Sequence, residues 1–389
     1  MPEGVLRLKR GRERARTHPW IFKGDVADVS STEPGAAVRV VDSAGQFVGR
    51  GLYNPRPALC CRLYTWRDEP LDEAFFARQV RAAVARRSRG VAPAVARLVW
   101  SEADGLPGFV CDRYGPVLVV QWLTLATAQR RRLLADALRA ALGPLPVFSA
   151  DEPGPADLEG FEPVRGWLDE AGPERVVVEE GPIRLAVTVG QGQKTGLYLD
   201  QRENRLAVAT LAPIAGDVLD AFAYTGAFAC QALAAGAGRA VCLESSPEAI
   251  AGARENFRLN GVEDRAEVVA GNAFDELRRL DREGQRFALV VLDPPPFTRS
   301  RHAVEAAARG YKEVNLRAMR LLAPGGTLLT FSCSHHVSAG LFEDIARAAA
   351  TDVGVRLLVC ERLTQSSDHP ELLTVPETRY LKGLRLQAI

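Results

Sequence analysis

The sequence predicts an α/β protein in which a C-terminal doubly wound parallel sheet follows a small β-barrel-like module and a central α+β unit. The 389 residues suit two or three domains of roughly 100–200 residues. Apolar residues make up 47% and charged residues 25%, as in ordinary globular proteins. From about residue 186, strand-like and helix-like segments alternate, which is typical of a parallel sheet covered by helices. We therefore expect domains at residues 1–70, 71–185 and 186–389.

The composition argues against several classes of protein. Lys and Arg total 49, Asp and Glu total 48, and the net charge of +1 favours no class of partner. No segment approaches the roughly 18 apolar residues of a membrane span, and the first residues lack the apolar core of a secretory signal. The seven cysteines form no C-x-x-C pair, which argues against a disulfide scaffold and favours a cytoplasmic location. We expect no bound metal and no membrane partner.

The N-terminal module is locally basic. Residues 1–66 carry eleven Lys and Arg against six Asp and Glu, a net charge of +5. Strand-like runs at 37–41, 47–52 and 59–66 are separated by turn signals, which predicts a small barrel-like sheet. The basic start is either a solvated arm or a surface that binds a phosphate backbone, and charge alone does not separate the two.

The central unit mixes helices and strands and has no obvious chemistry of its own. Apolar residues at helical spacing predict a helix over 71–89, and Thr127 is expected to cap a second helix that ends at Leu142. Strands are expected at 109–112, 117–123, 145–150, 176–179 and 183–189. The Pro-, Gly- and acid-rich residues 151–175 are expected to form a loop.

The C-terminal alternation predicts where a ligand would bind. The expected strands are 218–222, 240–244, 266–270, 287–292, 327–331 and 357–361. The expected helices are 226–235, 247–260, 273–282, 304–322 and 339–350. Ligands of doubly wound sheets bind outside the carboxyl ends of the strands, so the residues found there are the candidate site.

Polar residues end the first three of these strands. Asp220 ends the first, and Gly226 then opens a helix without the G-x-G-x-x-G pattern of a dinucleotide site. Glu244 ends the second, where a carboxylate can bind both hydroxyls of a ribose. Asn272 follows the third and can face the edge of an adenine. Each could be only a helix cap, but their coincidence favours an adenosine ligand without a pyrophosphate.

The fourth strand ends in Asp293-Pro294-Pro295-Pro296-Phe297. Three prolines fix the backbone and remove three N–H donors, so they form a rigid ledge. The ledge is either a simple turn out of the sheet or a platform. As a platform, Phe297 would stack on a planar base while Asp293 binds its polar edges. We favour the platform.

The fifth strand ends at Ser332-Cys333-Ser334, followed by two histidines, His335 and His336. A thiolate at Cys333 would face the same cleft as the proline ledge, and a neighbouring histidine could lower the pKa of the thiol. The remaining cysteines are expected to be buried small hydrophobic residues: Cys60, Cys61, Cys111, Cys230, Cys242 and Cys360.

These motifs resemble those of class I S-adenosylmethionine-dependent methyltransferases. They are most similar to the PUA-domain 5-methylcytosine methyltransferases of large-subunit (23S) ribosomal RNA. The resemblance covers nearly the whole chain and is carried by residues 18–22, 102–108, 110–115, 192–205 and 332–334. It implies a Rossmann-like methyltransferase domain at 186–389 and a PUA RNA-binding domain at 1–70. Better-known relatives carry a second cysteine where this chain has Pro296 or Phe297, so product release by a second thiol is not expected.

The resemblance also implies residue roles. Cys333 would be the nucleophile and Asp293 its catalytic partner, while Phe297, Pro294 and Pro295 would contact the base. S-adenosylmethionine would be the cofactor and S-adenosylhomocysteine the product. The implied cofactor contacts are Lys194, Thr195, Gly196, Tyr198, Asp200, Asp220, Phe222, Tyr224, Gly226, Glu244, Asn272 and Asp293.

Three functions stay open at this point. The first is formation of 5-methylcytosine in ribosomal RNA through a covalent bond between a cysteine and carbon 6 of the base. The second is N-methylation of adenine or guanine, which needs no thiol. The third is a non-catalytic RNA-binding or ribosome-assembly protein. The partner in each case is ribosomal RNA, and the oligomeric state is open, with a homodimer as one option.

Overall fold

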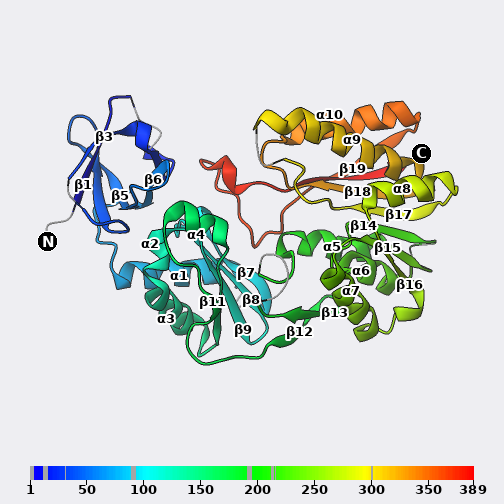
Figure 1. Ribbon diagram of the computed structural model, residues 1–389, viewed down its shortest axis with the longest axis horizontal. Coiled ribbons are helices and arrows are strands. Elements are labelled where there is room, and N and C mark those ends of the chain that lie inside the picture. Colours follow the sequence, from blue (N-terminus) through cyan, green and yellow to red (C-terminus); the bar gives the residue numbers. More distant parts are fainter. Residues whose placement is uncertain are drawn as a thin grey trace. The chain divides into compact units, whose positions relative to one another are not determined.

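A computed structural model describes residues 4–11, 16–30, 32–88, 93–190, 195–211, 214, 216–298 and 301–389 (Figure 1). The chain divides into two compact units. The first comprises Met1–Val176, Val187–Leu197 and Asp368–Thr378, and the second comprises Val177–Ala186, Tyr198–Ser367 and Arg379–Ile389. The three domains expected from the sequence stay a prediction.

Six N-terminal strands form one sheet with the order β2-β6-β5-β4-β1-β3. They are β1 (Gly4–Leu8), β2 (Trp20–Phe22), β3 (Val26–Val29), β4 (Ala37–Val41), β5 (Phe47–Tyr53) and β6 (Leu59–Thr65). Only β1 and β4 pair in parallel among the described strands of this sheet. The apolar side chains that form its core are Leu6, Leu8, Ile21, Val38, Val40, Val48, Cys61 and Leu63. The three expected strands are confirmed to within one residue, whereas the short β1, β2 and β3 were not expected.

The middle part of the chain, residues 73–167, packs helices against a five-stranded sheet with the order β11-β10-β9-β8-β7. The strands are β7 (Val95–Trp100), β8 (Phe109–Tyr114), β9 (Val117–Trp122), β10 (Val147–Ala150) and β11 (Arg165–Trp167). The helices are α1 (Glu73–Arg87), α2 (Leu125–Ala128), α3 (Arg131–Leu142) and α4 (Pro153–Glu159). Phe75, Phe76 and Val80 of α1 join its core, in which the rings of Phe109 and Trp122 stack 4.8 Å apart.

Two expectations for this unit are wrong. The residue that caps the second helical segment is Thr124, whose side chain accepts a hydrogen bond from the N–H of Thr127, and the helix breaks between α2 and α3. The expected loop 151–175 contains α4 and β11. Pro153 begins α4, where a fixed φ and a missing N–H cost nothing, so a proline here is a start signal for a helix. Beyond this sheet, β12 (Arg175–Glu180) and β13 (Ile183–Thr188) form a two-stranded ladder.

The C-terminal sheet has seven strands with the order β16-β15-β14-β17-β18-β20-β19. They are β14 (Val218–Ala221), β15 (Ala240–Glu244), β16 (Ala266–Ala270), β17 (Phe287–Leu292), β18 (Leu322–Ser332), β19 (Leu357–Thr364) and β20 (Lys382–Ala388). The strands β14 to β18 pair in parallel, but β20 is antiparallel to both β18 and β19. The expected all-parallel sheet is therefore corrected: β20 was not predicted, and it separates β19 from β18.

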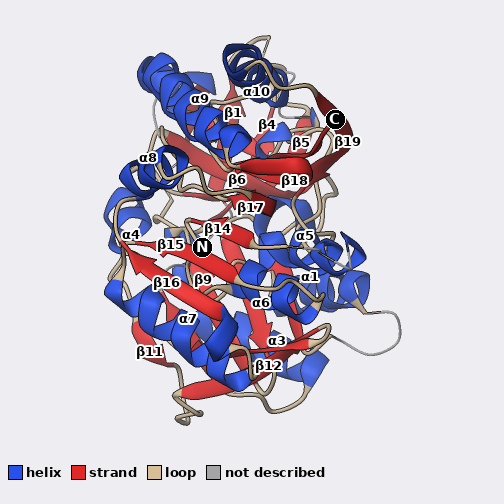
Figure 2. Cartoon of the chain, turned by 90° about the vertical axis from the view of Figure 1, so that its right-hand side faces the viewer, coloured by secondary structure: helices blue, strands red, loops and turns tan. Residues whose placement is uncertain are grey.

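Helices cover both faces of this sheet, as the doubly wound class requires (Figures 1 and 2). They are α5 (Arg202–Val208), α6 (Ala227–Ala234), α7 (Pro247–Leu259), α8 (Ala273–Arg282), α9 (Val304–Arg320) and α10 (Ala339–Val353). Buried residues of α8, α9 and α10 share one apolar core with β14, β15, β17 and β18. In both views α6 and α7 lie on the opposite face from α9 and α10. No helix in the described ranges is both long and apolar enough to cross a membrane.

Gly226 shows how closely the first strand end is packed. It precedes α6 with a φ of +69°, a conformation that residues with a side chain rarely adopt. A Cβ at this position would lie 2.7 Å from Cζ of Phe257 and 3.3 Å from the Cβ of Ala253, both in α7. Conformation and packing therefore both require glycine.

We expect Gly226→Ala to lower the free energy of unfolding by about 2–4 kcal/mol, because it adds backbone strain and a steric clash. Gly236→Ala is the matched control, since Gly236 has a φ of +96° but nothing within 4 Å of the added Cβ. It should cost about 1–2 kcal/mol from strain alone. Urea unfolding of both variants measures the difference, and equal losses would show that the contact with α7 imposes no constraint.

Candidate active site

The carboxyl ends of neighbouring parallel strands meet at one edge of the C-terminal sheet. Ala221 at the end of β14 pairs with Leu243 in β15 and with Leu292 in β17, and Leu292 pairs with Thr330 in β18. The residues that follow these four strands therefore lie close together at this edge of the sheet. The predicted site residues that end or follow these strands are Phe222, Glu244, Asp293 and Cys333.

The turn after β14 is strained. Phe222 has a φ of 64° and Tyr224 a φ of 49°, values that bulky side chains rarely adopt. Neighbouring groups hold the turn in place. The N–H of Ala223 donates to the carbonyl oxygen of Leu243 at 3.0 Å, and the N–H of Tyr224 donates to Oε2 of Glu244 at 2.8 Å. Backbone strain of this kind, about 1–3 kcal/mol per residue, concentrates at ligand sites.

Glu244 presents a carboxylate whose orientation is already fixed. Oε2 accepts the N–H of Tyr224, while Oε1 accepts the N–H groups of Ser245 at 2.7 Å and Ser246 at 2.9 Å. The side chain is only half-buried. A carboxylate offers about four acceptor positions, so these three contacts leave capacity for a ligand hydroxyl.

Asp220 is buried and supports the start of α6. Its Oδ2 accepts the N–H of Ala229 at 3.1 Å. Burial raises the pKa of Asp220 well above its usual range, and the nearby carboxylates of Asp293 and Glu244 raise it further, whereas the Ala229 N–H and Arg205 lower it. Asp220 therefore acts as a cap for the first turn of α6. A direct contact between Asp220 and the cofactor stays a prediction.

Asn272 lies at the end of β16 and also caps a helix. Its Oδ1 accepts the N–H of Phe274 at 2.9 Å in the first turn of α8. The N–H of the preceding Gly271 donates to the carbonyl oxygen of Glu244 at 3.0 Å, which ties this segment to the end of β15. The side chain is exposed. Contact of Asn272 with an adenine stays a prediction.

The proline ledge places its aromatic residue in a cluster of rings. Pro294 is buried and Pro295 is exposed. The ring of Phe297 lies 4.5 Å from that of Tyr311 and 5.6 Å from that of Phe274. This packing gives Phe297 a structural role at the end of the sheet, and its stacking on a base stays a prediction.

Cys333 lies beside the ledge. Its Sγ is 3.9 Å from the carbonyl oxygen of Pro294, and the residue is half-buried. The flanking Ser332 and Ser334 are fully buried, and the hydroxyls of Ser334 and Tyr311 lie 2.9 Å apart. Two buried serines thus fix the backbone on each side of the thiol.

The other cysteines divide into two groups. Five are buried, as expected: Cys60, Cys61, Cys111, Cys230 and Cys242. Burial raises the pKa of Cys60 to about 11, which makes it a poor nucleophile. The expectation that Cys360 is buried is wrong, because it lies in the edge strand β19 and is exposed.

Tyr198 and Asp200 come from the segment before α5. The rings of Tyr198 and Tyr224 meet edge to face at 5.0 Å, and burial is the main cause that raises the pKa of Tyr198. Asp200 is buried, and its Oδ2 accepts the hydroxyl of Tyr380 at 2.5 Å. The ring of His335 lies 5.8 Å from that of Tyr380. Cofactor contacts by Tyr198 and Asp200, and an effect of either histidine on Cys333, stay predictions.

The segment predicted to close over the cofactor is anchored in the first unit. Lys194 falls outside the described residues. Thr195 is buried, and its hydroxyl donates to Oδ2 of Asp112 at 2.5 Å and lies 3.0 Å from the hydroxyl of Tyr114. Arg97 binds both oxygens of Asp112, at 2.8 and 2.7 Å. The hydroxyl of Thr195 is therefore engaged within this buried network.

Gly196 is held by the same network. Its φ is +147°, and a Cβ would lie 2.8 Å from Cγ1 of Val187. The N–H of Leu197 then donates to the hydroxyl of Tyr114 at 3.1 Å. Packing explains the glycine, so a cofactor contact at Gly196 stays a prediction.

Sequence analysis did not identify several residues that contact the predicted site residues. Asp112 and Tyr114 hold Thr195 within the first unit, and they lie in the stretch 110–115, for which no chemistry was predicted. From the sequence, Tyr311 is expected only on the apolar face of a helix. In the structure its hydroxyl lies 2.9 Å from that of Ser334. Lys382 begins the unpredicted β20, and the available signal was that it is one of few lysines in an arginine-rich chain.

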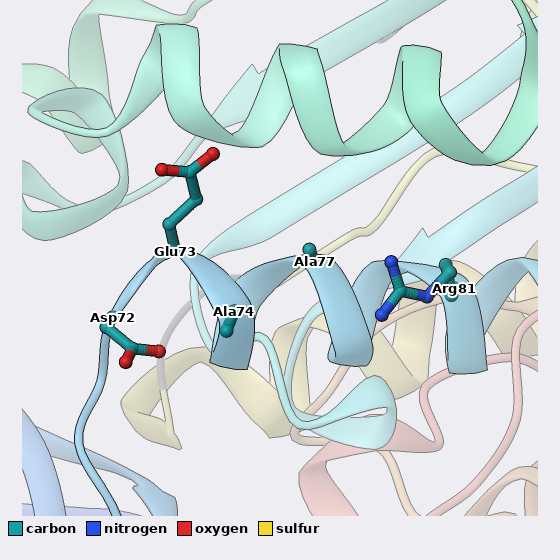
Figure 3. Close-up of a pocket in the computed structure, with 5 residues that line it drawn as sticks. All are labelled: Asp72, Glu73, Ala74, Ala77 and Arg81. Atoms are coloured by element: carbon teal, nitrogen blue, oxygen red, sulfur yellow. The ribbon is translucent and has the colours of Figure 1, made fainter.

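A separate open depression of about 520 Å³ lies at the start of α1 (Figure 3). Asp72, Glu73, Ala74, Ala77 and Arg81 line it, and none of them is a predicted site residue. The carboxylate of Asp72 accepts the N–H of Phe75, which is the ordinary cap of a helix. Among the described residues, no group of three or more His, Cys, Asp or Glu is arranged to hold a metal ion.

Comparisons with known proteins match both ends of the chain. A family model described as an S-adenosylmethionine-dependent methyltransferase matches residues 162–385, and a PUA-like domain model matches residues 5–66. Two solved structures have the same fold over 98% of this chain and 99% of theirs, at 18% sequence identity. One is a methyltransferase in complex with S-adenosylhomocysteine, with a TM-score of 0.84. The other is a methyltransferase from Streptococcus mutans, with a TM-score of 0.83.

Curated relatives align along the full length. The ribosomal RNA large subunit methyltransferase I of Alteromonas mediterranea is 37% identical over 98% of this chain and 97% of its own. The protein of that name from Shewanella denitrificans is 38% identical over 97% of this chain and 98% of its own. The predicted fold class, PUA-like module and cofactor are thereby confirmed. The chain belongs to the S-adenosylmethionine-dependent methyltransferase family.

Proposed function

We propose that this chain methylates carbon 5 of a cytosine in large-subunit ribosomal RNA through a covalent bond between Cys333 and carbon 6 of the base. The observation that carries the proposal is the position of Cys333, with its Sγ 3.9 Å from the carbonyl oxygen of Pro294, at the strand ends of a methyltransferase. The names of the full-length relatives support ribosomal RNA as the substrate. The described cysteines are free thiols, which suits a reaction in the reducing cytoplasm.

The residues at the sheet edge fit an adenosine-containing cofactor. Glu244 holds its carboxylate rigid and half-exposed, with about one acceptor position left for a ribose hydroxyl. Asn272 has an exposed polar side chain that suits an adenine edge, and the turn at Phe222 and Tyr224 has the backbone strain that is typical of ligand sites. Asp220, near the end of β14, holds the start of α6 through its hydrogen bond with the N–H of Ala229. When bound, S-adenosylmethionine supplies a methyl group on a positively charged sulfur.

Covalent catalysis by Cys333 makes the base reactive. Carbon 5 of cytosine is a weak nucleophile. When the thiolate bonds to carbon 6, the electron pair of the double bond shifts into the ring and carbon 5 becomes enamine-like. Asp293 binds or protonates ring nitrogen 3 or the exocyclic amine, and the proton or hydrogen bond at that nitrogen stabilises the negative charge that the attack places on the ring. After methylation, a water molecule acts as the base and takes the carbon 5 proton. The electron pair of that C–H bond re-forms the double bond between carbons 5 and 6, and the bond between carbon 6 and sulfur breaks to release the thiolate.

N-methylation of adenine or guanine is the alternative within the same family. An Asp-Pro-Pro sequence followed by an aromatic residue also suits that chemistry, but Cys333 would then have no part in it. Membership of a methyltransferase family disfavours the non-catalytic alternative. Variants of Cys333 therefore separate the two remaining functions.

We expect Glu244→Gln to weaken S-adenosylmethionine binding by roughly 10- to 100-fold, because it replaces a charged acceptor of ribose hydroxyls. Glu248→Gln, an exposed substitution in the first turn of α7, is the matched control and should leave binding unchanged. Isothermal titration calorimetry measures both. Wild-type affinity in the Glu244 variant would place the cofactor elsewhere.

We expect Cys333→Ala to abolish methyl transfer while S-adenosylmethionine affinity stays near wild type, because the thiol contacts the base. Cys360→Ala, which removes the exposed thiol of β19, should keep full activity. With RNA that carries 5-fluorocytosine, the wild type should form an adduct stable to denaturant, since fluorine cannot leave as a proton does. Full turnover by the Cys333 variant would instead favour N-methylation.

Exposed basic residues next to the N-terminal strands should bind the RNA backbone. Nζ of Lys9 donates to the carbonyl oxygen of Gly24 at 2.9 Å, which brings Lys9 next to the residue that follows Lys23. Lys9, Arg10 and Lys23 are all exposed. Changing these three to glutamine should weaken RNA binding and reduce its salt dependence, because fewer counterions are released. Cofactor binding should not change.

The control removes three charges from the other unit, the exposed Arg254, Arg258 and Arg286. Filter binding at several salt concentrations gives the slope for each triple variant. If the Lys9, Arg10 and Lys23 variant keeps the wild-type slope, the basic N-terminal stretch is only a solvated arm.

A further inference from the structure

A buried lysine lies beside Cys333. Lys382 is 8% exposed, and the pairing of β18 with β20 sets it opposite Ser332. Its Nζ donates to the carbonyl oxygen of Ser334 at 2.6 Å and to that of Tyr380 at 2.9 Å. The side chain therefore touches the backbone just after Cys333, and its strand pairs with the residue just before it.

This amine keeps most of its charge at neutral pH. Burial lowers the pKa of Lys382 to about 8, with Cys333 raising it and Arg379 lowering it. At pH 7 about nine in ten molecules then carry an ammonium group. An ammonium has three N–H donors, and the two carbonyl oxygens occupy two of them.

Other titratable groups also lie around Cys333. Burial raises the pKa of Tyr311, which packs from α9, and that of Tyr198, which precedes η4 (Leu199–Gln201), so both are neutral at pH 7. Asp293, at the end of β17, opposes a second negative charge when it is ionised. The remaining titratable groups near the thiol are His335, His336 and Arg379.

We propose that Lys382 is a positioning residue whose ammonium group holds Cys333 in the thiolate form. The inference rests on the proposed function, in which Cys333 is the nucleophile. An adjacent cation favours a thiolate, and the thiolate is the reactive species. A purely structural Lys382 would only join the carbonyl groups of Ser334 and Tyr380, and its charge would not affect the thiol.

The test measures alkylation of Cys333 by iodoacetamide as a function of pH in the full-length protein, with each cysteine followed by mass spectrometry. In Lys382→Met the pH midpoint for Cys333 should rise by at least one unit, and alkylation at pH 7 should slow by about 10-fold or more. Lys382→Arg should stay close to wild type because it keeps the charge. Lys312→Met, whose amine pairs with Asp352 on the surface, is the matched control.

The exposed Cys360 serves as an internal reference in every sample. An unchanged Cys333 profile in a folded Lys382→Met protein would overturn the proposal. If that variant does not fold, the wild-type protein still tests the proposal. Its Cys333 should titrate below Cys360, and a midpoint at or above that of Cys360 would overturn the proposal. No RNA is present, so these results are independent of whether carbon 5 is the methylated atom.

Discussion

The parallel pairing of β14 with β15 on one side and β17 on the other is the constraint on which the rest of the site depends. Because both neighbours run in the same direction, three strands deliver their following residues to one edge, and β18 adds a fourth. The same arrangement forces the tight turn at Phe222 and Tyr224, which the end of β15 holds through Glu244. The proposed cofactor contacts and the proposed thiol chemistry thus share one edge, because parallel strands place the residues that follow them at the same edge of the sheet.

Much of the fold could be predicted from local patterns. Largely apolar runs mark the parallel strands, so β15, β16 and β17 begin and end where the sequence predicts them, although β16 lies at the edge of the sheet and is only partly buried. The antiparallel β20 was missed because only a short 3-10 helix, η8 (Pro376–Thr378), is described between it and β19, and because its pairing with β18 and β19 is set by tertiary contacts. The exposed Cys360 has the same origin, since β20 leaves β19 at the edge of the sheet. Residue type alone does not reveal which strand is at an edge.

The site was predictable in its position more than in its contacts. Glu244 and Cys333 lie where strand ends place them, but side-chain direction decides what each residue touches. Asp220 faces α6, Thr195 faces Asp112, and Phe297 faces Tyr311, so three residues that suggest ligand contacts are engaged in support. Lys382 shows the converse, because a lysine in an unpredicted strand becomes the buried cation beside the thiol. Sequence patterns indicate which segments lie close together. The packing of side chains decides which polar groups remain available to contact a ligand.

We propose that this sheet edge forms 5-methylcytosine in ribosomal RNA. Nucleoside mass spectrometry of large-subunit ribosomal RNA tests this function most directly, in cells that lack this gene and in the same cells carrying the wild-type copy. One 5-methylcytosine should disappear with the gene and return with the wild-type copy. An unchanged 5-methylcytosine content, together with loss of a methylated adenine or guanine, would contradict it.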